Sequence, residues 1–321
     1  MKIYFISKIF LLTIILISCE SENPIATETG NGKIVVNANV DKGIIYVDEK
    51  FTGKFTPDTL ELFAVKHLIK VRKEGYFSEQ KEIAIKKDEV ISEIFILTKN
   101  NLSKNVLLET FTNSGCDSCK NSNELFSNLM NKYPQRLFIL NHPTRYPNQN
   151  DPMNLEVMED VNKRLEYYIF FDVPQYVIDG NKNNLIEITI NEQLNKLTKL
   201  EITVIDSLIS GDGLTIDVFL DVYDLDEIDF SSLVLRIALI EKSIIFETPP
   251  GTNGQKEFNY ILRGMIPDYK GISLAGINKV GRAKFAKFML LNPRWKKENL
   301  SVIAFVQNEL TKEVLQVTNS E

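Results

Sequence analysis

The chain has 321 residues, of which 44% are hydrophobic and 25% are charged, and its formal net charge at pH 7 is −6. This is the composition of an ordinary globular protein, and a chain of this length can form more than one hydrophobic core. The acidic balance and the lack of a basic stripe argue against nucleic acid as a partner. With 2 histidines and 3 cysteines, the sequence offers few residues for a metal site or a histidine-based catalytic triad.

Residues 1–18 have the pattern of an export signal peptide. Lysines near the start precede the apolar run 9–17, which is too short to span a bilayer. Residues 16–19 read Leu-Ile-Ser-Cys, and this tetrapeptide resembles the lipobox of bacterial lipoproteins. The resemblance implies cleavage before Cys19, a diacylglycerol on its thiol and a fatty acid such as palmitate on the new amino group. The alternative is a plain secretory signal in which Cys19 is incidental.

A lipid on Cys19 is the membrane contact that the sequence implies, because no other segment reaches about 18 consecutive apolar residues. Several acyl chains, at about 0.8 kcal/mol per buried methylene, give durable anchoring. The polar residues 19–32 predict a flexible tether. We therefore expect a protein held by its lipid at the outer membrane of the cell envelope, on either the periplasmic or the surface face.

Residues 33–98 consist of short apolar runs rich in β-branched residues, which predict a small antiparallel β-sandwich. The segment resembles a PEGA domain. The matching residues are Ile45-Tyr46-Val47-Asp48, Gly53, Thr56-Pro57, Lys66-His67 and Lys73-Glu74-Gly75-Tyr76. The resemblance implies a non-catalytic spacer or binding module in which His67 is a structural strand residue. It departs from the PEGA pattern at Glu49, where a glycine is common.

Residues 104–198 alternate between strand and helix patterns. The expected elements are a strand at 106–111, the motif Cys116-Asp117-Ser118-Cys119 at the start of a helix, a strand at 137–140, a helix around 155–168, and a strand at 176–178 after Val173-Pro174. This order is typical of a thioredoxin-like α/β domain. We expect the three strands to share one sheet, with the helix after Cys116 packed on it.

Residues 199–321 return to strand patterns and predict a second β-sandwich. The candidate strands are 202–205, 214–222, 233–240, 285–291, 302–306 and 314–317. The expected fold class is therefore multidomain, with a PEGA-like β-sandwich, a thioredoxin-like α/β domain and a C-terminal β-sandwich. An acidic run at 221–229 lacks the residue spacing of an EF-hand and predicts a solvated hairpin.

Residues 105–319 together resemble the outer membrane protein 28 family of envelope lipoproteins. The matching stretches are Leu107 to Thr112, Val173-Pro174, Ala238 to Glu241, Ile261 to Arg263 and Val302 to Asn308. In that family a thioredoxin-like domain precedes a β-rich domain. The resemblance therefore implies a fold and an envelope location more than an activity.

A Cys-Xaa-Xaa-Cys pair can exchange disulfides when its first thiol is a thiolate. Cys116 would be the nucleophile, at the positive end of a helix dipole, and Cys119 would resolve the mixed disulfide. Lys120 would add positive charge nearby. Pro174 would face the cysteines and place a backbone edge for a substrate strand, as in thioredoxins. Glu109 resembles the buried carboxylate that some thioredoxins use for proton transfer.

The alternative is a non-catalytic surface or binding lipoprotein in which Cys116 and Cys119 form a structural or vestigial disulfide. Gly115 stands where thioredoxins usually have tryptophan, and Ser118 stands where they usually have proline. A zinc site would need two more ligands, and only His142 is a candidate. An exposed Cys116 sulfur beside a cis Pro174 would favour exchange, whereas a buried sulfur would favour a structural disulfide.

Apart from the lipid on Cys19 we expect no cofactor and no metal. The expected partners are the membrane and, where the cysteines are active, a protein thiol or disulfide substrate. The sequence leaves open whether the protein is an enzyme.

Overall fold

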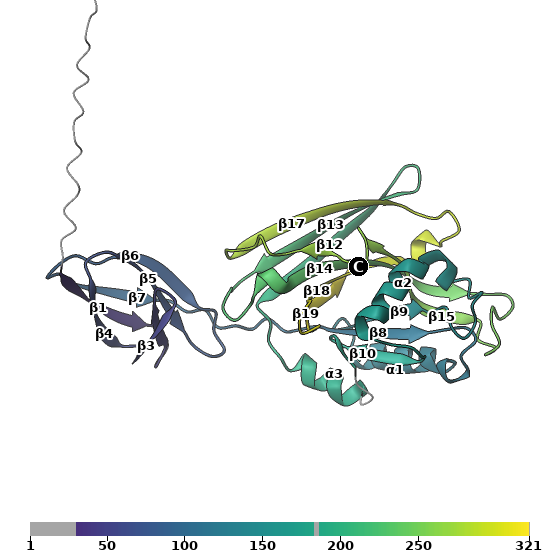
Figure 1. Cartoon of the computed structure of the whole chain (residues 1–321), viewed down its shortest axis with the longest axis horizontal. Helices are drawn as coiled ribbons and strands as arrows, with labels where there is room; N and C mark the ends of the chain where they lie inside the picture. Colours follow the sequence, from purple (N-terminus) through teal and green to yellow (C-terminus); the bar gives the residue numbers. More distant parts are fainter. Residues whose placement is uncertain (1–29, 183–185, 321) are drawn as a thin grey trace, which may run out of the picture. The chain divides into compact units, whose positions relative to one another are not determined.

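The computed structural model of the chain describes residues 30–182 and 186–320. The expected signal peptide, Cys19 and most of the expected tether lie outside the described residues, so lipidation stays a prediction. The chain divides into two compact units, Met1–Lys70 with Gln80–Phe95, and Val71–Glu79 with Ile96–Glu321. Strands dominate both (Figure 1). In the part of the chain that the structure describes, no helix is long and apolar enough to cross a membrane.

The N-terminal module contains a three-stranded sheet in the order β4-β1-β7 and a four-stranded sheet in the order β3-β2-β5-β6. The strands are β1 (Asn31–Ala38), β2 (Ile44–Val47), β3 (Lys50–Phe55), β4 (Asp58–Phe63), β5 (Lys66–Arg72), β6 (Glu79–Ala84) and β7 (Val90–Phe95). Alternate side chains such as Ile34 and Val36 are fully buried, as expected for a sheet with one face on a core. The expectation of a purely antiparallel sandwich is wrong at one pair, because β1 and β7 are parallel. The first and last strands of the module are far enough apart in the chain to allow this.

Two details of the N-terminal module bear on its predicted role. His67 is buried in β5, with its ring nitrogens 2.7 Å from the Asp48 carboxylate and 3.1 Å from the Phe63 carbonyl oxygen. These contacts agree with a structural role for His67. Asp48 and Glu49 both have positive φ, at 49° and 63°, so Glu49 adopts the left-handed conformation that a glycine would favour in a two-residue hairpin turn.

The second unit is built around a nine-stranded sheet and a separate three-stranded sheet. The nine-stranded sheet has the order β11-β10-β8-β9-β15-β14-β18-β19, with β16 paired to β14, and the three-stranded sheet has the order β12-β13-β17. The strands are β8 (Val106–Thr112), β9 (Leu137–Pro143), β10 (Gln175–Ile178), β11 (Asn181–Lys182), β12 (Leu200–Ile209), β13 (Gly213–Val222), β14 (Leu233–Ile245), β15 (Glu257–Ile266), β16 (Ile272–Ser273), β17 (Gly281–Leu290), β18 (Leu300–Asn308) and β19 (Val314–Asn319). The helices are α1 (Ser122–Lys132), α2 (Asn154–Tyr168) and α3 (Ile186–Leu194), with 3-10 helices η1 (Asp117–Cys119), η2 (Phe230–Ser232) and η3 (Lys297–Asn299).

The three strands expected between residues 104 and 198 do share one sheet. β8 pairs in parallel with β9 and antiparallel with β10. Phe126 and Leu129 of α1 pack with Val106 and Leu108 of β8, so the helix after Cys116 lies on this sheet as predicted. Successive β8 side chains face opposite sides, and Leu107 packs with Val161 of α2 on the other face.

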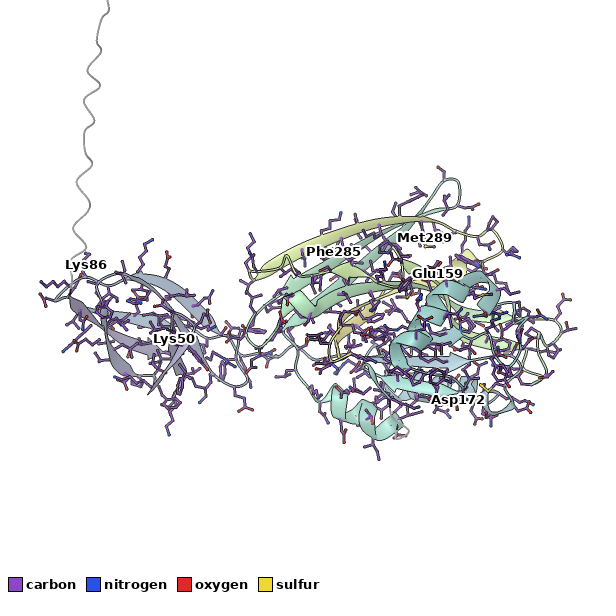
Figure 2. The ribbon with its side chains drawn as sticks, in the orientation of Figure 1. Lys50, Lys86, Glu159, Asp172, Phe285 and Met289 are labelled. Atoms are coloured by element: carbon purple, nitrogen blue, oxygen red, sulfur yellow. A yellow bond between two sulfur atoms is a disulfide. The ribbon has the colours of Figure 1, made fainter. Side chains whose placement is uncertain are left out.

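The same sheet also contains strands from the C-terminal part of the chain, after residue 198. β9 pairs in parallel with β15, where Ile261 lies opposite Asn141. β15 pairs with β14, and β14 pairs in turn with β18. The three-stranded sheet packs against β14 and β18 in the large core that contains Leu235 and Val302. Phe285 and Met289, labelled along β17 in Figure 2, pack against this core. Residues 199–320 therefore form a two-sheet sandwich that shares one sheet with residues 106–182.

Candidate functional site

Cys116 and Cys119 form a disulfide, with their Cα atoms 5.3 Å apart. β8 ends at Thr112, the chain then crosses a short loop, and Cys116 immediately precedes η1. Both residues are buried, with exposed fractions of 5% for Cys116 and 2% for Cys119. The disulfide therefore lies beneath the surface at the end of the sheet where β8 meets its loop.

The loop before Cys116 is fixed by polar side chains from the neighbouring loop after β9. The Asn113 amide donates to the carbonyl oxygens of Thr144 and Asn148, at 2.6 and 3.1 Å. The Asn113 side-chain oxygen accepts from the backbone N–H groups of Gly115 and Asn148. The Ser114 N–H donates to the Asp151 carboxylate at 2.8 Å. The backbone that carries Cys116 thus has little freedom to move.

A second loop, formed by residues 249–254 between β14 and β15, packs on the same backbone, and we call it the covering loop. The Asn253 side-chain amide donates to the carbonyl oxygens of Cys116 and Asn113, at 3.2 and 3.4 Å. The Asn253 backbone N–H donates to the Ser114 carbonyl oxygen at 3.2 Å. A Cβ added at Gly251 would lie 2.2 Å from that same oxygen, so only glycine fits this approach.

The cysteine motif precedes a short 3-10 helix, and the long helix expected there begins only after it. Cys116 is the N-cap of the three-residue helix η1, and α1 begins only at Ser122. Because a helix dipole acts mainly within the first turn, α1 contributes little field at Cys116. Asp117 lies in the first turn of η1, where its negative charge opposes a thiolate. Lys120, at the C-cap of η1, is exposed.

Glu109 is fully buried in β8 and belongs to an ion-paired network rather than to the cysteine loop. Its two carboxylate oxygens each accept from Arg164 at 2.7 Å. Nε2 of His142 lies 3.0 Å away, and the Tyr168 hydroxyl donates at 2.6 Å. Burial raises the pKa of Glu109, but Arg164 and His142 outweigh burial and hold it well below its usual range. This carboxylate is ionised and fully engaged, which suits packing better than proton transfer.

His142 and Pro174 complete the residues singled out from the sequence. The His142 ring stacks on Phe111 with centroids 4.7 Å apart, and burial lowers its pKa, which favours the neutral imidazole. The Val173–Pro174 peptide bond is cis and precedes β10.

Within residues 30–182 and 186–320, no three His, Cys, Asp or Glu side chains are grouped to hold a metal ion. The acidic run includes Asp229, which caps η2 by accepting from the Ser231 N–H.

Sequence reasoning missed two groups around this site. Arg164 lies between Val161 and Leu165 in the apolar stripe of α2. An arginine at such a buried helix position indicates that a buried acidic side chain pairs with it. Asn253 gave no such signal. It follows Pro249-Pro250-Gly251, which marks only a turn.

A family model matches the N-terminal module, and several solved structures match parts of the chain. Residues 31–101 match the PEGA domain family. No curated protein matches the chain. HBP35 of Porphyromonas gingivalis is 18% identical over 69% of this chain and 76% of its own, with a TM-score of 0.58, which shows a similar fold.

Two further structures have lower scores. Protein AGR_C_4864 from Agrobacterium tumefaciens is 13% identical over 67% of this chain and 92% of its own, with a TM-score of 0.42. A domain of the outer membrane lipoprotein Omp28 from Porphyromonas gingivalis is 17% identical over 39% of this chain and 88% of its own, with a TM-score of 0.28.

Proposed function

We propose that the chain is a lipid-anchored binding protein of the bacterial cell envelope, held at the outer membrane, and that its Cys116–Cys119 disulfide is structural. The lipobox-like residues 16–19 support the anchor, and the PEGA match supports a displayed N-terminal module. Residues 104–198 would form a thioredoxin-like unit. The order of β8, α1, β9, α2 and β10, with parallel β8 and β9 and antiparallel β10, supports that assignment.

The burial of Cys116 carries the structural assignment of the disulfide. Disulfide exchange needs an incoming thiolate to reach a sulfur atom, so its rate depends on access. Cys116 is only 5% exposed, and its carbonyl oxygen is held by Asn253 of the covering loop. Glu109, one of the groups expected to assist exchange, is paired with Arg164 and is therefore not free to transfer a proton.

Thiol–disulfide exchange is the second candidate function, and the position of Cys116 favours it. Cys116 directly precedes η1 and is the more exposed of the two cysteines. A partner thiolate would attack Sγ of Cys116, the S–S bond would break, and Cys119 would leave as a thiolate. A second thiolate of the partner would then attack the partner's own sulfur in the mixed disulfide and form the partner's disulfide. Cys116 would leave as a thiolate, so the partner is oxidised as the Cys116–Cys119 pair is reduced.

The test is catalysis of insulin reduction by dithiothreitol, using detergent-solubilised full-length protein and its Cys116→Ser variant. A structural disulfide predicts that wild type and variant leave the uncatalysed rate unchanged. A rate enhancement by wild type that is lost in Cys116→Ser would overturn the proposal in favour of exchange.

A further inference from the structure

A cleft of about 460 Å³ opens beside α2, in the second unit, and none of its lining residues belongs to the disulfide loop. Its size falls in the range of small-molecule sites, about 300–1,000 Å³. Four of its lining residues are basic, two are acidic and two are tyrosines: Lys163, Arg164, Arg236, Lys270, Glu166, Glu309, Tyr167 and Tyr269. The lining therefore has two more positive than negative side chains, and three of the basic ones pair with carboxylates: Lys163 with Glu166, Arg236 with Glu309 and Arg164 with Glu109.

Two buried guanidinium groups form the inner part of the cleft. Arg164 is 4% exposed and Arg236 is 3% exposed. Both donate to the side-chain oxygen of Gln307, at 2.9 and 3.0 Å. The ring of Tyr167 lies 4.8 Å from the Arg164 guanidinium carbon and 5.2 Å from that of Arg236. Their positions are thus fixed by hydrogen bonds and by the same aromatic ring.

One donor of Arg164 has no protein partner in the described part of the chain. Nη1 of Arg164 is buried and has no hydrogen-bond partner among the described residues, whereas Nε and Nη2 of the same side chain are bonded to Glu109. A buried N–H of a charged group that stays unpaired is costly. Such a donor is explained most simply by a ligand or water oxygen that completes it.

The rim of the cleft carries two lysines that remain accessible. Lys163 pairs with Glu166 at 2.8 Å, yet its side chain is 40% exposed. Lys270 is exposed, and its ammonium lies 5.8 Å from the centroid of the Tyr269 ring. Rim lysines of this kind attract an anion toward the buried arginines.

We propose that this cleft binds a small organic oxyanion, a carboxylate or phosphate ester with a flat apolar body. The oxyanion would face Nη1 of Arg164 and the remaining N–H groups of Arg236, which also donates to the Tyr269 carbonyl oxygen and to the Glu309 carboxylate. Guanidinium groups match carboxylate and phosphate geometry. The apolar body would pack on Tyr167 and Tyr269, which are the aromatic side chains of the lining. The site is independent of the disulfide and gives the binding protein a ligand class of its own.

Calorimetric titration of the full-length protein at low salt tests this site. The probes are inorganic phosphate, phenyl phosphate and benzoate, which separate phosphate from carboxylate recognition and reveal any contribution of the aromatic body. Lys270→Ala and Lys163→Ala remove the rim charges without touching the buried network. Arg164 is left intact, because its loss would strand the Glu109 carboxylate and endanger folding.

The matched control is Lys284→Ala. Lys284 is an exposed lysine on β17 whose ammonium lies 5.4 Å from the Phe219 ring, so it resembles Lys270 but lines no part of the cleft. We expect saturable one-to-one binding of phenyl phosphate or benzoate, weakened about fivefold by each rim substitution and unchanged by the control. Absence of saturable binding up to about 10 mM of every probe, or equal weakening by Lys284→Ala, overturns the proposal. Saturable binding of inorganic phosphate that matches phenyl phosphate overturns the role of the apolar body.

Discussion

At the scale of single residues, burial and charge act against each other at several carboxylates of the second unit. Asp179 is fully buried and accepts from the Lys104 ammonium and from the Leu107 N–H. Burial raises the pKa of Asp179 to about 6, against the opposing effect of Lys104. Glu109 behaves in the opposite way, because its two-point contact with Arg164 outweighs burial. The number and geometry of the partners decides which effect prevails.

The raised pKa of Asp179 predicts a pH effect with a definite sign. Between its ordinary value of 3.8 and its folded value of about 6, the folded state holds the proton more tightly than the unfolded state. Stability from this residue is therefore greatest at low pH and falls as pH rises through this window. Urea unfolding of wild type and Asp179→Asn should show the wild type losing stability relative to the variant from pH 4 to 7. Parallel curves, or a relative gain by wild type, would show that Lys104 prevails over burial.

Cys19 gives the second prediction at this scale. The Leu-Ile-Ser-Cys sequence at 16–19 predicts cleavage before Cys19 and a diacylglycerol on its sulfur. Intact-mass analysis of membrane-extracted protein should show both modifications, and Cys19→Ser should move the protein into the soluble fraction. An unmodified mature chain, or cleavage at another bond, would remove the anchor from the account.

At the scale of elements, the covering loop packs on the backbone that carries the disulfide. Its asparagine, Asn253, makes two side-chain hydrogen bonds to the backbone around Cys116. Each such bond contributes about 1 kcal/mol. Together they hold the loop against the backbone of residues 113–116.

Opening the covering loop should therefore speed reduction of the disulfide. We expect Asn253→Ala to raise the rate of reduction by dithiothreitol about thirtyfold, in line with about 2 kcal/mol for the two lost hydrogen bonds. Gly251→Ala should act in the same direction, because its Cβ would collide with the Ser114 oxygen. The controls are Asn299→Ala, which removes a comparable side-chain bond to Ser243, and Gly276→Ala, whose Cβ would meet nothing within 4 Å. Equal rates in all four variants would mean that the loop does not limit access.

Elements were predictable from sequence where their pattern is uniform. β8 and β9 each begin with an apolar run and are buried along their whole length, and β13 alternates regularly. β15 escaped prediction because Asn259, Arg263 and Gly264 interrupt its apolar pattern. α3 escaped because its β-branched residues favour strands. The Cys-Xaa-Xaa-Cys motif could be found in sequence, but its burial could not, because Asn253 comes from a distant loop.

At the scale of the whole molecule, the second unit shares one sheet between two segments that the sequence treats separately. β9 pairs with β15, and Arg164 of α2 bonds both Glu109 of β8 and Gln307 of β18. Trp295, near the C-terminal sandwich, donates to Glu156 of α2 at 2.8 Å. These contacts couple residues 104–198 to residues 199–321.

This coupling predicts that a change in β8 is felt at Trp295, the single tryptophan of the chain. Glu109→Gln leaves the Arg164 charge buried without its counter-ion, which costs about 3–5 kcal/mol. The unfolding midpoint measured by Trp295 fluorescence should therefore fall as much as the midpoint measured by far-UV circular dichroism. Glu166→Gln, which removes only the exposed pair with Lys163, should leave both unchanged. A Trp295 transition unaffected by Glu109→Gln would show that the two segments unfold independently.

The reduction potential of the Cys116–Cys119 pair tests the central claim most directly. It is obtained by equilibrating the full-length protein in dithiothreitol buffers of graded potential and counting free thiols by mass. Structural disulfides typically have potentials below about −300 mV, whereas exchange proteins lie between about −270 and −120 mV. The buried pair beneath the covering loop predicts a value below about −300 mV, and a value within the range of exchange proteins would contradict the account.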